Sequence, residues 1–296
     1  MLGQPRHVGI LGATSLVGAC LLPLLTGAGW QVTAFSRRRV AHKGLEVLWQ
    51  QLPASGGLPP LASLSEGSLP LWICVAPIWV LPEYFGLLDA QRARRVVVLS
   101  STSRFTKDDS TDPEEQATAR RLADAEDRVQ AWAESRGVEW VILRPTLIYG
   151  LGRDKNIAEM ARIICRLSFF PLFGRANGLR QPIHAEDVAL VCLSALQMPN
   201  AANQTYNISG SETIPYREMV TRVFTALERP PRLLTVPLWA FRLAVAVLRY
   251  LPGHRQWSAA MAERMNRDLV FDHAKAAREL SFKPRAFELT AKDLPL

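Results

Sequence analysis

The feature that most constrains this chain is a glycine turn between an apolar run and a helix-like segment. Val8 to Leu11 has the length of a buried strand, Gly12 breaks it, and apolar residues resume with helical spacing from Leu16 to Leu25. A strand, a glycine turn and a helix in this order direct the helix-start N–H groups at a pyrophosphate. Gly18 follows six residues after Gly12, but Ser15 stands where a middle glycine is expected. We predict a dinucleotide site; the alternative is an ordinary strand-to-helix turn.

The second apolar run predicts which dinucleotide binds. Gln31 to Phe35 has the pattern of the next parallel strand, and it ends in Ser36, Arg37, Arg38 and Arg39. A site for NAD usually has an acidic residue at this point, which binds the ribose 2′-hydroxyl, whereas arginine suits a 2′-phosphate. We therefore predict NADP(H) as the cofactor, with NAD the less favoured alternative.

The rest of the first half alternates apolar runs with helical segments, as βαβ units do. The sequence predicts strands at Glu46–Trp49, Leu71–Val75, Arg95–Leu99 and Trp140–Leu143, and helices at Pro82–Ala93 and Pro113–Arg136. The run before Ser100 has no polar alternation, which is typical of a strand buried on both faces. We predict an α/β fold with a Rossmann-type, doubly wound parallel sheet.

Composition shifts after Gly150, and the second half has mostly helical patterns. The sequence predicts helices at Asn156–Ser168, Glu186–Gln197 and Pro215–Leu227, an apolar loop at Phe169–Gly174 and a strand at Tyr206–Ile208. We predict a dinucleotide-binding domain at residues 1–150 and a smaller, mostly helical substrate lobe at residues 151–296, interleaved with the sheet. The apolar stretch Leu238–Leu251 is shorter than the roughly 20 residues of a transmembrane helix. It either caps the substrate lobe or lies in a membrane interface.

Bulk composition narrows the function classes. The chain has 296 residues, of which 48% are hydrophobic, so it can bury a large core. The four cysteines (Cys20, Cys74, Cys165 and Cys192) form no C-x-x-C pair and the five histidines have no ligand spacing, so we expect a reduced, cytoplasmic protein without a metal site. No N-terminal signal peptide is expected. The net charge of +8 fits an anionic cofactor and substrate, and no zinc-finger or RNP-like motif indicates nucleic acid.

Four motifs, in this order and spacing, resemble the extended short-chain dehydrogenase/reductase superfamily. The resemblance runs over nearly the whole chain and is strongest to the NAD(P)-dependent epimerase/dehydratase group, which acts on nucleotide sugars. The motifs are Gly12–Gly18, Leu99–Thr102, Arg144–Gly150 and Gly178–Ala189. The last motif matches the pattern R-x-x-x-H-x-x-D-x-A and is the most specific.

The resemblance implies a role for individual positions. Cofactor contacts are implied for Gly12, Thr14, Ser15, Leu16, Val17 and Gly18 at the pyrophosphate, Ser36, Arg37 and Arg38 at the 2′-phosphate, Ala76 and Pro77 at the nicotinamide ribose, and Pro145 and Leu147 behind the nicotinamide. Thr102 falls at the family's catalytic Ser/Thr position. Arg180 falls where related enzymes clamp the substrate diphosphate, a task suited to a guanidinium. His184 and Asp187 are expected to hold the junction of the two lobes by hydrogen bonds.

One departure from the family pattern concerns proton transfer. Related enzymes use a Tyr-x-x-x-Lys pair on the long helix after the fifth strand, followed four residues later by a glutamate. Matching that glutamate to Glu126 puts Thr118 at the tyrosine position and Leu122 at the lysine position, and no tyrosine of the chain precedes a lysine by four residues. A positioned proton-transfer group is worth about 10² to 10⁴ in rate. Arg120 and Arg121 point about 100° away on either side of Leu122, and either could take over the lysine's ribose contact.

These observations leave more than one functional hypothesis open. The first is an NADP(H)-dependent reductase or epimerase acting on a nucleotide sugar or similar phosphorylated substrate, with Thr102, a water or the substrate as the acid. The second is a non-catalytic NADP-binding sensor or scaffold, and the third a membrane-peripheral accessory protein. An open polar cavity near Arg180 would favour the enzyme, whereas a cavity filled by Phe169, Phe170 and Phe173 would favour the binding protein. A homodimer through the helices at 82–93 and 113–136 is a further expectation.

Overall fold

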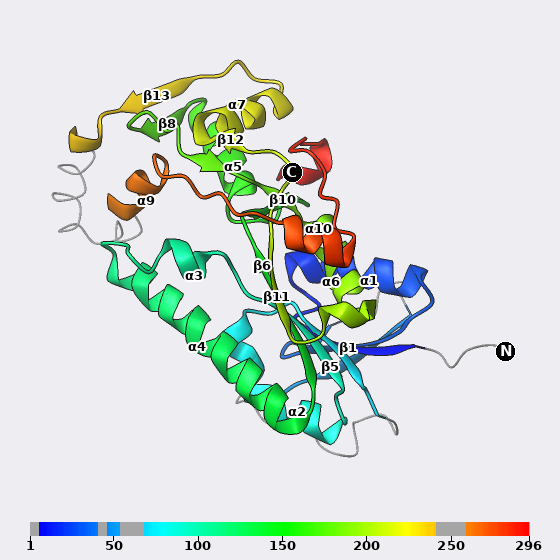
Figure 1. The fold of residues 1–296 in the computed structure, drawn as a ribbon. Helices are drawn as coiled ribbons and strands as arrows, with labels where there is room; N and C mark the ends of the chain where they lie inside the picture. Colours follow the sequence, from blue (N-terminus) through cyan, green and yellow to red (C-terminus); the bar gives the residue numbers. More distant parts are fainter. Residues whose placement is uncertain (1–5, 41–45, 54–67, 241–258, 296) are drawn as a thin grey trace.

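The computed structural model describes residues 6–40, 46–53, 68–240 and 259–295 (Figure 1). Most of the apolar stretch Leu238–Leu251, and residues 54–67 before strand β4 (Leu71–Cys74), lie outside these residues. Within the described ranges, no helix is both long and apolar enough to cross a membrane.

Seven parallel strands form the central sheet, in the order β11-β6-β5-β4-β1-β2-β3. The strands besides β4 are β1 (His7–Leu11), β2 (Gln31–Ser36), β3 (Val47–Gln51), β5 (Arg95–Leu99), β6 (Glu139–Pro145) and β11 (Gln204–Ile208). Every residue of β5 is buried, which explains its continuous apolar sequence. The strand order reverses between β1 and β4, and ligands of such sheets bind in the crevice at this switch point. The predicted doubly wound sheet is confirmed.

Helices cover both faces of the sheet (Figure 1). One face carries α1 (Leu16–Gly27) and α6 (Ala185–Gln197), and the other carries the 3-10 helix η2 (Ile78–Tyr84), α2 (Phe85–Ala90) and the long α4 (Pro113–Arg136). Each face has its own hydrophobic cluster, in which Leu21 and Val188 belong to the first and Leu122 and Val129 to the second. The sheet is therefore the middle layer of a three-layer sandwich.

The predicted helix at Pro82–Ala93 is wrong in its bounds and partly in its type. The helical segment begins at Ile78 as a 3-10 helix, and its α-helical part, α2, ends at Ala90. Pro82 lies inside the 3-10 segment and supplies no backbone N–H for an α-helical bond. Arg92 then adopts a left-handed conformation with φ 53°, which ends the helix.

A second group of elements packs at the carboxyl end of the sheet (Figure 1). It consists of α3 (Ser103–Thr106), β7 (Ile148–Tyr149), α5 (Ile157–Leu167), β8 (Phe170–Phe173), β9 (Leu179–Arg180), β10 (Ile183–His184), β12 (Ile214–Pro215), α7 (Tyr216–Ala226), β13 (Leu233–Val236), α9 (Ala259–Arg264) and η4 (Ala291–Asp293). Two further elements, η3 (Pro199–Ala201) and α10 (Ala274–Leu280), belong to the hydrophobic cluster of the α1 and α6 face instead. The prediction of an apolar loop at Phe169–Gly174 is wrong, because β8 forms a parallel ladder with β13. A third hydrophobic cluster joins β8 to α5 and α7.

Candidate functional site

The glycine turn brings the ends of β1 and β4 into contact. Gly12 has φ +83°, and a Cβ atom there would lie only 2.3 Å from the backbone nitrogen of Ala76. Ser15 caps α1, because its Oγ accepts a hydrogen bond from the Gly18 N–H at 3.1 Å. A Cβ atom at Gly18 would collide with the Ala13 carbonyl oxygen. The serine at the expected middle-glycine position is thus the cap of the helix that faces the ligand crevice.

A cavity of about 680 Å³ lies along this edge of the sheet. Ligand pockets are commonly about 300–1,000 Å³, so its size suits a large part of a dinucleotide. Among the predicted cofactor residues, the cavity brings together Gly12, Thr14, Ser15, Ser36, Arg37, Arg38, Ala76 and Pro77. Leu16, Val17, Gly18, Pro145 and Leu147 do not line it. Val17 and Gly18 are buried in α1, and the contacts of all these residues with a cofactor stay predictions.

The basic end of β2 contributes cations to this cavity. Arg37 and Arg38 are exposed, and the Arg38 N–H donates to the Ser36 Oγ at 3.1 Å. Across the described residues, no carboxylate forms an ion pair with Arg37, Arg38 or Arg39. Their positive charge is therefore available to an anionic ligand.

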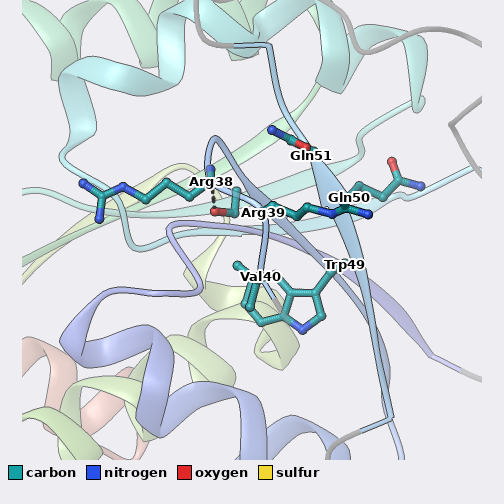
Figure 2. A pocket seen from close by; sticks show the side chains of 7 residues that line it. Arg38, Arg39, Val40, Trp49, Gln50 and Gln51 are labelled. Atoms are coloured by element: carbon teal, nitrogen blue, oxygen red, sulfur yellow. Dashed lines mark hydrogen bonds between the residues drawn. The ribbon is translucent and has the colours of Figure 1, made fainter. Parts of the chain in front are cut away.

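A second cavity of about 560 Å³ adjoins the same strand end, and Ser36 and Arg38 line both cavities. Figure 2 shows the side chains of Arg38 and Arg39 extending in opposite directions, with Arg39 running toward Gln50 of β3. Trp49 and Val40 lie together beside the Arg39 side chain (Figure 2). The arginines thus spread positive charge across both cavities at the carboxyl end of β2.

The remaining wall of the larger cavity comes from residues that the sequence analysis missed or did not assign. The missed lining residues are Leu11, Phe35, Leu52, Cys74, Trp79, Val80, Leu81, Glu83 and Tyr84, and Arg121 joins them from α4. Tyr84 is 2% exposed, burial raises its pKa, and its hydroxyl has no hydrogen-bond partner among the described residues. A buried polar group without a partner fits a ligand that supplies one. The aromatic segment Ile78–Tyr84, directly after a buried strand, was the sequence signal that could have indicated this wall.

Thr102, the predicted catalytic residue, lies just after β5. It is buried, and both its Oγ1 and its N–H donate to the Pro145 carbonyl oxygen at 3.1 Å. These bonds attach the β5 end to the β6 end. Thr102 does not line either cavity described above, and its catalytic role stays a prediction.

A buried ion cluster fixes how α4 sits against the two strand ends. Glu126 is 0% exposed; its carboxylate accepts hydrogen bonds from the Ser100 hydroxyl, from Arg104 and from Arg144, the last at 2.6 Å. In this register, the Thr118 Oγ1 donates to the Glu114 carbonyl oxygen at 2.9 Å, and Leu122 is 3% exposed in the core. Neither position presents an ionisable side chain to the site.

Arg180, the predicted diphosphate clamp, already has three carbonyl partners. Its guanidinium donates to the carbonyl oxygens of Leu179 at 2.7 Å, Arg267 at 2.8 Å and Arg264, and it lies 5.5 Å from the Tyr216 ring centroid. Burial lowers the pKa of Arg180 to about 10. These bonds hold the end of α9 and the turn that follows it onto β9.

Arg180 also lines a separate cavity of about 320 Å³. The polar lining consists of Lys155, Asn156, Glu159, Arg180, Tyr216 and Arg264, and the apolar lining of Leu147, Met160, Ile163, Phe170 and Met265. Phe170 therefore forms one wall of this cavity, while Phe173 belongs to the neighbouring hydrophobic cluster. The cavity stays open and carries cationic side chains.

His184 and Asp187 join the C-terminal segment to α6 by hydrogen bonds, and their expected role at the junction of the two lobes stays a prediction. The His184 Nε2 lies 3.0 Å from the Asp293 Oδ1, and the Asp187 carboxylate accepts the Arg285 N–H at 2.9 Å. Burial opposes ionisation of Asp293, but hydrogen bonds from His184 and Thr290 outweigh it, so the pKa of Asp293 is lowered. Within the described ranges, no cluster of His, Cys, Asp or Glu side chains could hold a metal ion.

Comparison with known proteins shows which family and fold this chain resembles. Residues 85–209 match the model of the NAD dependent epimerase/dehydratase family. UDP-glucose 4-epimerase from Vibrio cholerae is 26% identical over 180 residues, which are 61% of this chain and 52% of that protein. The resemblance to the epimerase/dehydratase family is confirmed. The chain spans about half the length, or less, of the curated relatives that it matches.

Several solved structures show the same fold over nearly the whole chain. UDP-glucuronic acid 4-epimerase from Bacillus cereus, in complex with NAD, has a TM-score of 0.71 and 13% identity, and the match covers 97% of this chain and 95% of that one. MoeE5, in complex with UDP-glucose and NAD, has a TM-score of 0.64 and 19% identity over 95% of this chain and 94% of that one. A shorter match, 27% identical over 82 residues, is to subunit 9 of the NADH dehydrogenase [ubiquinone] 1 alpha subcomplex of Dictyostelium discoideum, covering 28% of this chain and 22% of that protein.

Proposed function

We propose that this chain binds NADP(H) in the 680 Å³ cavity and acts as a reductase or epimerase on a nucleotide sugar or similar phosphorylated substrate. The observation that carries the cofactor assignment is the placement of Arg37 and Arg38 on the same cavity as the glycine turn, without a carboxylate partner among the described residues. An arginine at this strand end suits a 2′-phosphate. The cofactor supplies hydride transfer when bound.

The residues of the cavity fit the parts of such a cofactor. The free N–H groups at the start of α1 suit the pyrophosphate, and the apolar side chains of Phe35, Leu52 and Leu81 suit an aromatic base. The Tyr84 hydroxyl offers an unused hydrogen-bonding group in the same cavity. The two solved relatives named above contain NAD, so the preference for NADP(H) rests on this chain's own arginines.

The smaller cavity supports the substrate class. Lys155, Arg180 and Arg264 give this cavity a cationic lining, which suits a diphosphate. Leu147, which is expected to lie behind the nicotinamide, also lines this cavity. Relatives and solved neighbours are named as enzymes of UDP-sugars. Lys155 is exposed and forms no ion pair among the described residues, so it is the freest cation of the three.

We further propose that this chain lacks the proton-transfer pair of its relatives. The buried Glu126 supports the register that puts Thr118 and Leu122 at the tyrosine and lysine positions. Threonine has no comparable acidity, and a core leucine has no charge. Proton transfer then depends on Thr102, a water or the substrate, and turnover is expected to be about 10² to 10⁴ slower than with a positioned acid.

A second candidate function is a non-catalytic NADP(H)-binding protein. Two observations favour it: Leu122 is buried in the core, and the Arg180 guanidinium already bonds three carbonyl oxygens. Both candidates require NADP(H) to bind, and they differ in whether hydride reaches a substrate.

The experiment that separates them follows deuteride transfer. The purified chain is incubated with NADPH deuterated at C4 and a panel of nucleotide keto-sugars, and deuterium in the sugar is measured by mass spectrometry. We expect slow transfer to at least one sugar, and a Thr102→Val variant that binds NADPH normally but transfers more slowly. NADPH binding without any deuteride transfer would contradict the enzyme hypothesis and support the non-catalytic NADP(H)-binding protein. Absence of NADPH binding would refute both hypotheses.

A further inference from the structure

We propose that Arg121, held against the face of Trp79, is a cofactor-anchoring cation that supplies the positive charge of α4 to the dinucleotide cavity. The proposal rests on the proposed function, because it assigns a residue to the same NADP(H) site. It gives α4 a binding role in a chain where Thr118 and Leu122 offer neither an acid nor a charge.

The position of the guanidinium carries this inference. The Arg121 Cζ lies 4.6 Å from the centroid of the Trp79 ring, and both residues line the cavity that also contains Gly12 and Ser15. A cation over an indole face is attracted by the ring, so the contact limits the orientations that the long arginine side chain adopts. Trp79 is half-buried and packs against the hydrophobic cluster of the α4 face, which makes it a fixed support.

The rotation of α4 about its axis explains why this residue, and not a neighbour, reaches the cavity. Leu122 points into the core, and successive helix residues differ by about 100° in direction. Both arginines are exposed, but Arg121 turns toward η2 and lines the cavity, whereas Arg120 does not line it. Neither arginine forms an ion pair with a carboxylate among the described residues. The chain therefore keeps one oriented cation on this wall, one position before the family's lysine.

The chemistry of a guanidinium sets what Arg121 does and does not do. It presents several N–H donors to phosphate or ribose oxygens, and it stays protonated at any pH the protein encounters. It therefore binds and orients the cofactor but does not act as a proton donor. Arg121 lies on α4, next to Leu122, and does not belong to the basic end of β2. We therefore assign it to the part of the cofactor that NADPH and NADH share.

The test is a binding titration followed by tryptophan fluorescence. The full chain and its Arg121→Ala, Arg121→Lys and Arg120→Ala variants are titrated with NADPH and with NADH, and a Trp79→Phe variant identifies the signal of Trp79 among the eight tryptophans. We expect Arg121→Ala to weaken both dinucleotides by about tenfold or more, the loss of one charge-assisted contact. Arg121→Lys should recover part of this loss, and Arg120→Ala should bind as the wild type does.

The outcomes distinguish this inference from the proposed function. If the wild type binds NADPH and Arg121→Ala binds it equally well, Arg121 does not anchor the cofactor and only this inference fails. If the wild type binds neither dinucleotide, the proposed function fails with it. A loss confined to NADPH would move Arg121 to the 2′-phosphate and would also overturn the assignment. Because Arg121 is exposed, urea unfolding should show wild-type stability for both Arg121 variants.

Discussion

Arg37→Glu is expected to weaken NADPH binding at least 100-fold while changing NADH binding by less than about threefold. A hydrogen bond to a charged group contributes about 1.5–3 kcal/mol, so loss of the contact alone costs roughly 10- to 100-fold. The new carboxylate also repels the doubly negative 2′-phosphate. NADH has a hydroxyl at that point, so it loses little. The measurement is a calorimetric titration at low salt, where screening is weak.

The matched control for this substitution is Arg128→Glu. Arg128 is exposed on α4 and lines none of the described cavities. Its replacement by glutamate changes the net charge of the chain by the same amount as Arg37→Glu. It should leave both affinities at the wild-type level. An equal loss of NADPH and NADH in Arg37→Glu would show that Arg37 does not recognise the 2′-phosphate.

The second large effect is on stability: Glu126→Gln should lower the free energy of unfolding by about 3–5 kcal/mol, the usual loss when one partner of a buried ion pair is removed. The Glu126 carboxylate is fully buried between the Ser100 hydroxyl and the guanidinium groups of Arg104 and Arg144. Glutamine keeps the shape but leaves the largely buried Arg144 without a counter-charge. Urea unfolding measures the difference, and Glu134→Gln, an exposed position on the same helix, is the control.

This contribution depends on pH in a definite direction. Burial raises the pKa of Glu126, but the hydrogen bonds from Arg144 and Ser100 outweigh burial, and the net pKa lies below its ordinary value. The stability that Glu126 supplies is therefore present above the ordinary carboxyl pKa of about 4.3 and is lost as pH falls through the lower, folded-state value. The gap between wild type and Glu126→Gln should shrink below about pH 4. A gap that stays constant, or one that is small at pH 7, would mean that the cluster does not stabilise the fold through this charge.

The sequence predicted the sheet and α4 well because their signals are local. The predicted bounds of α4 match the structure: the Asp112 carboxylate caps its start, Pro113 occupies the first turn and Gly137 ends it with φ 65°. Val8–Leu11, Leu71–Cys74, Val96–Leu99 and Trp140–Leu143 are continuous apolar runs, so the order of β1, β4, β5 and β6 along the chain was visible. The edge strands β3 (VLWQQ) and β11 (QTYNI) contain polar residues, and both extend beyond the predicted bounds Glu46–Trp49 and Tyr206–Ile208 at one end. The basic end of β2 was equally local, and its arginines do line the predicted cavity.

The parts that sequence patterns missed depend on distant pairing or on rotation of an element. Phe170–Phe173 became a strand because Leu233–Val236 pairs with it, and nothing near Phe170 indicates that partner. Trp79 reaches the cavity because the segment before Pro82 is already helical. Arg180 matched the diphosphate position by motif alone, while two of its three carbonyl partners, Arg264 and Arg267, depend on the path of α9 and the turn after it.

We propose above all that the cavity over the glycine turn binds a dinucleotide and prefers NADP(H) to NAD(H). The most direct test is a side-by-side titration of the wild-type chain with NADPH and NADH under identical low-salt conditions. We predict that both bind and that NADPH binds at least tenfold more tightly, about 1.4 kcal/mol, because Arg37 and Arg38 line the cavity. Equal affinities, tighter binding of NADH, or binding of neither dinucleotide would contradict it.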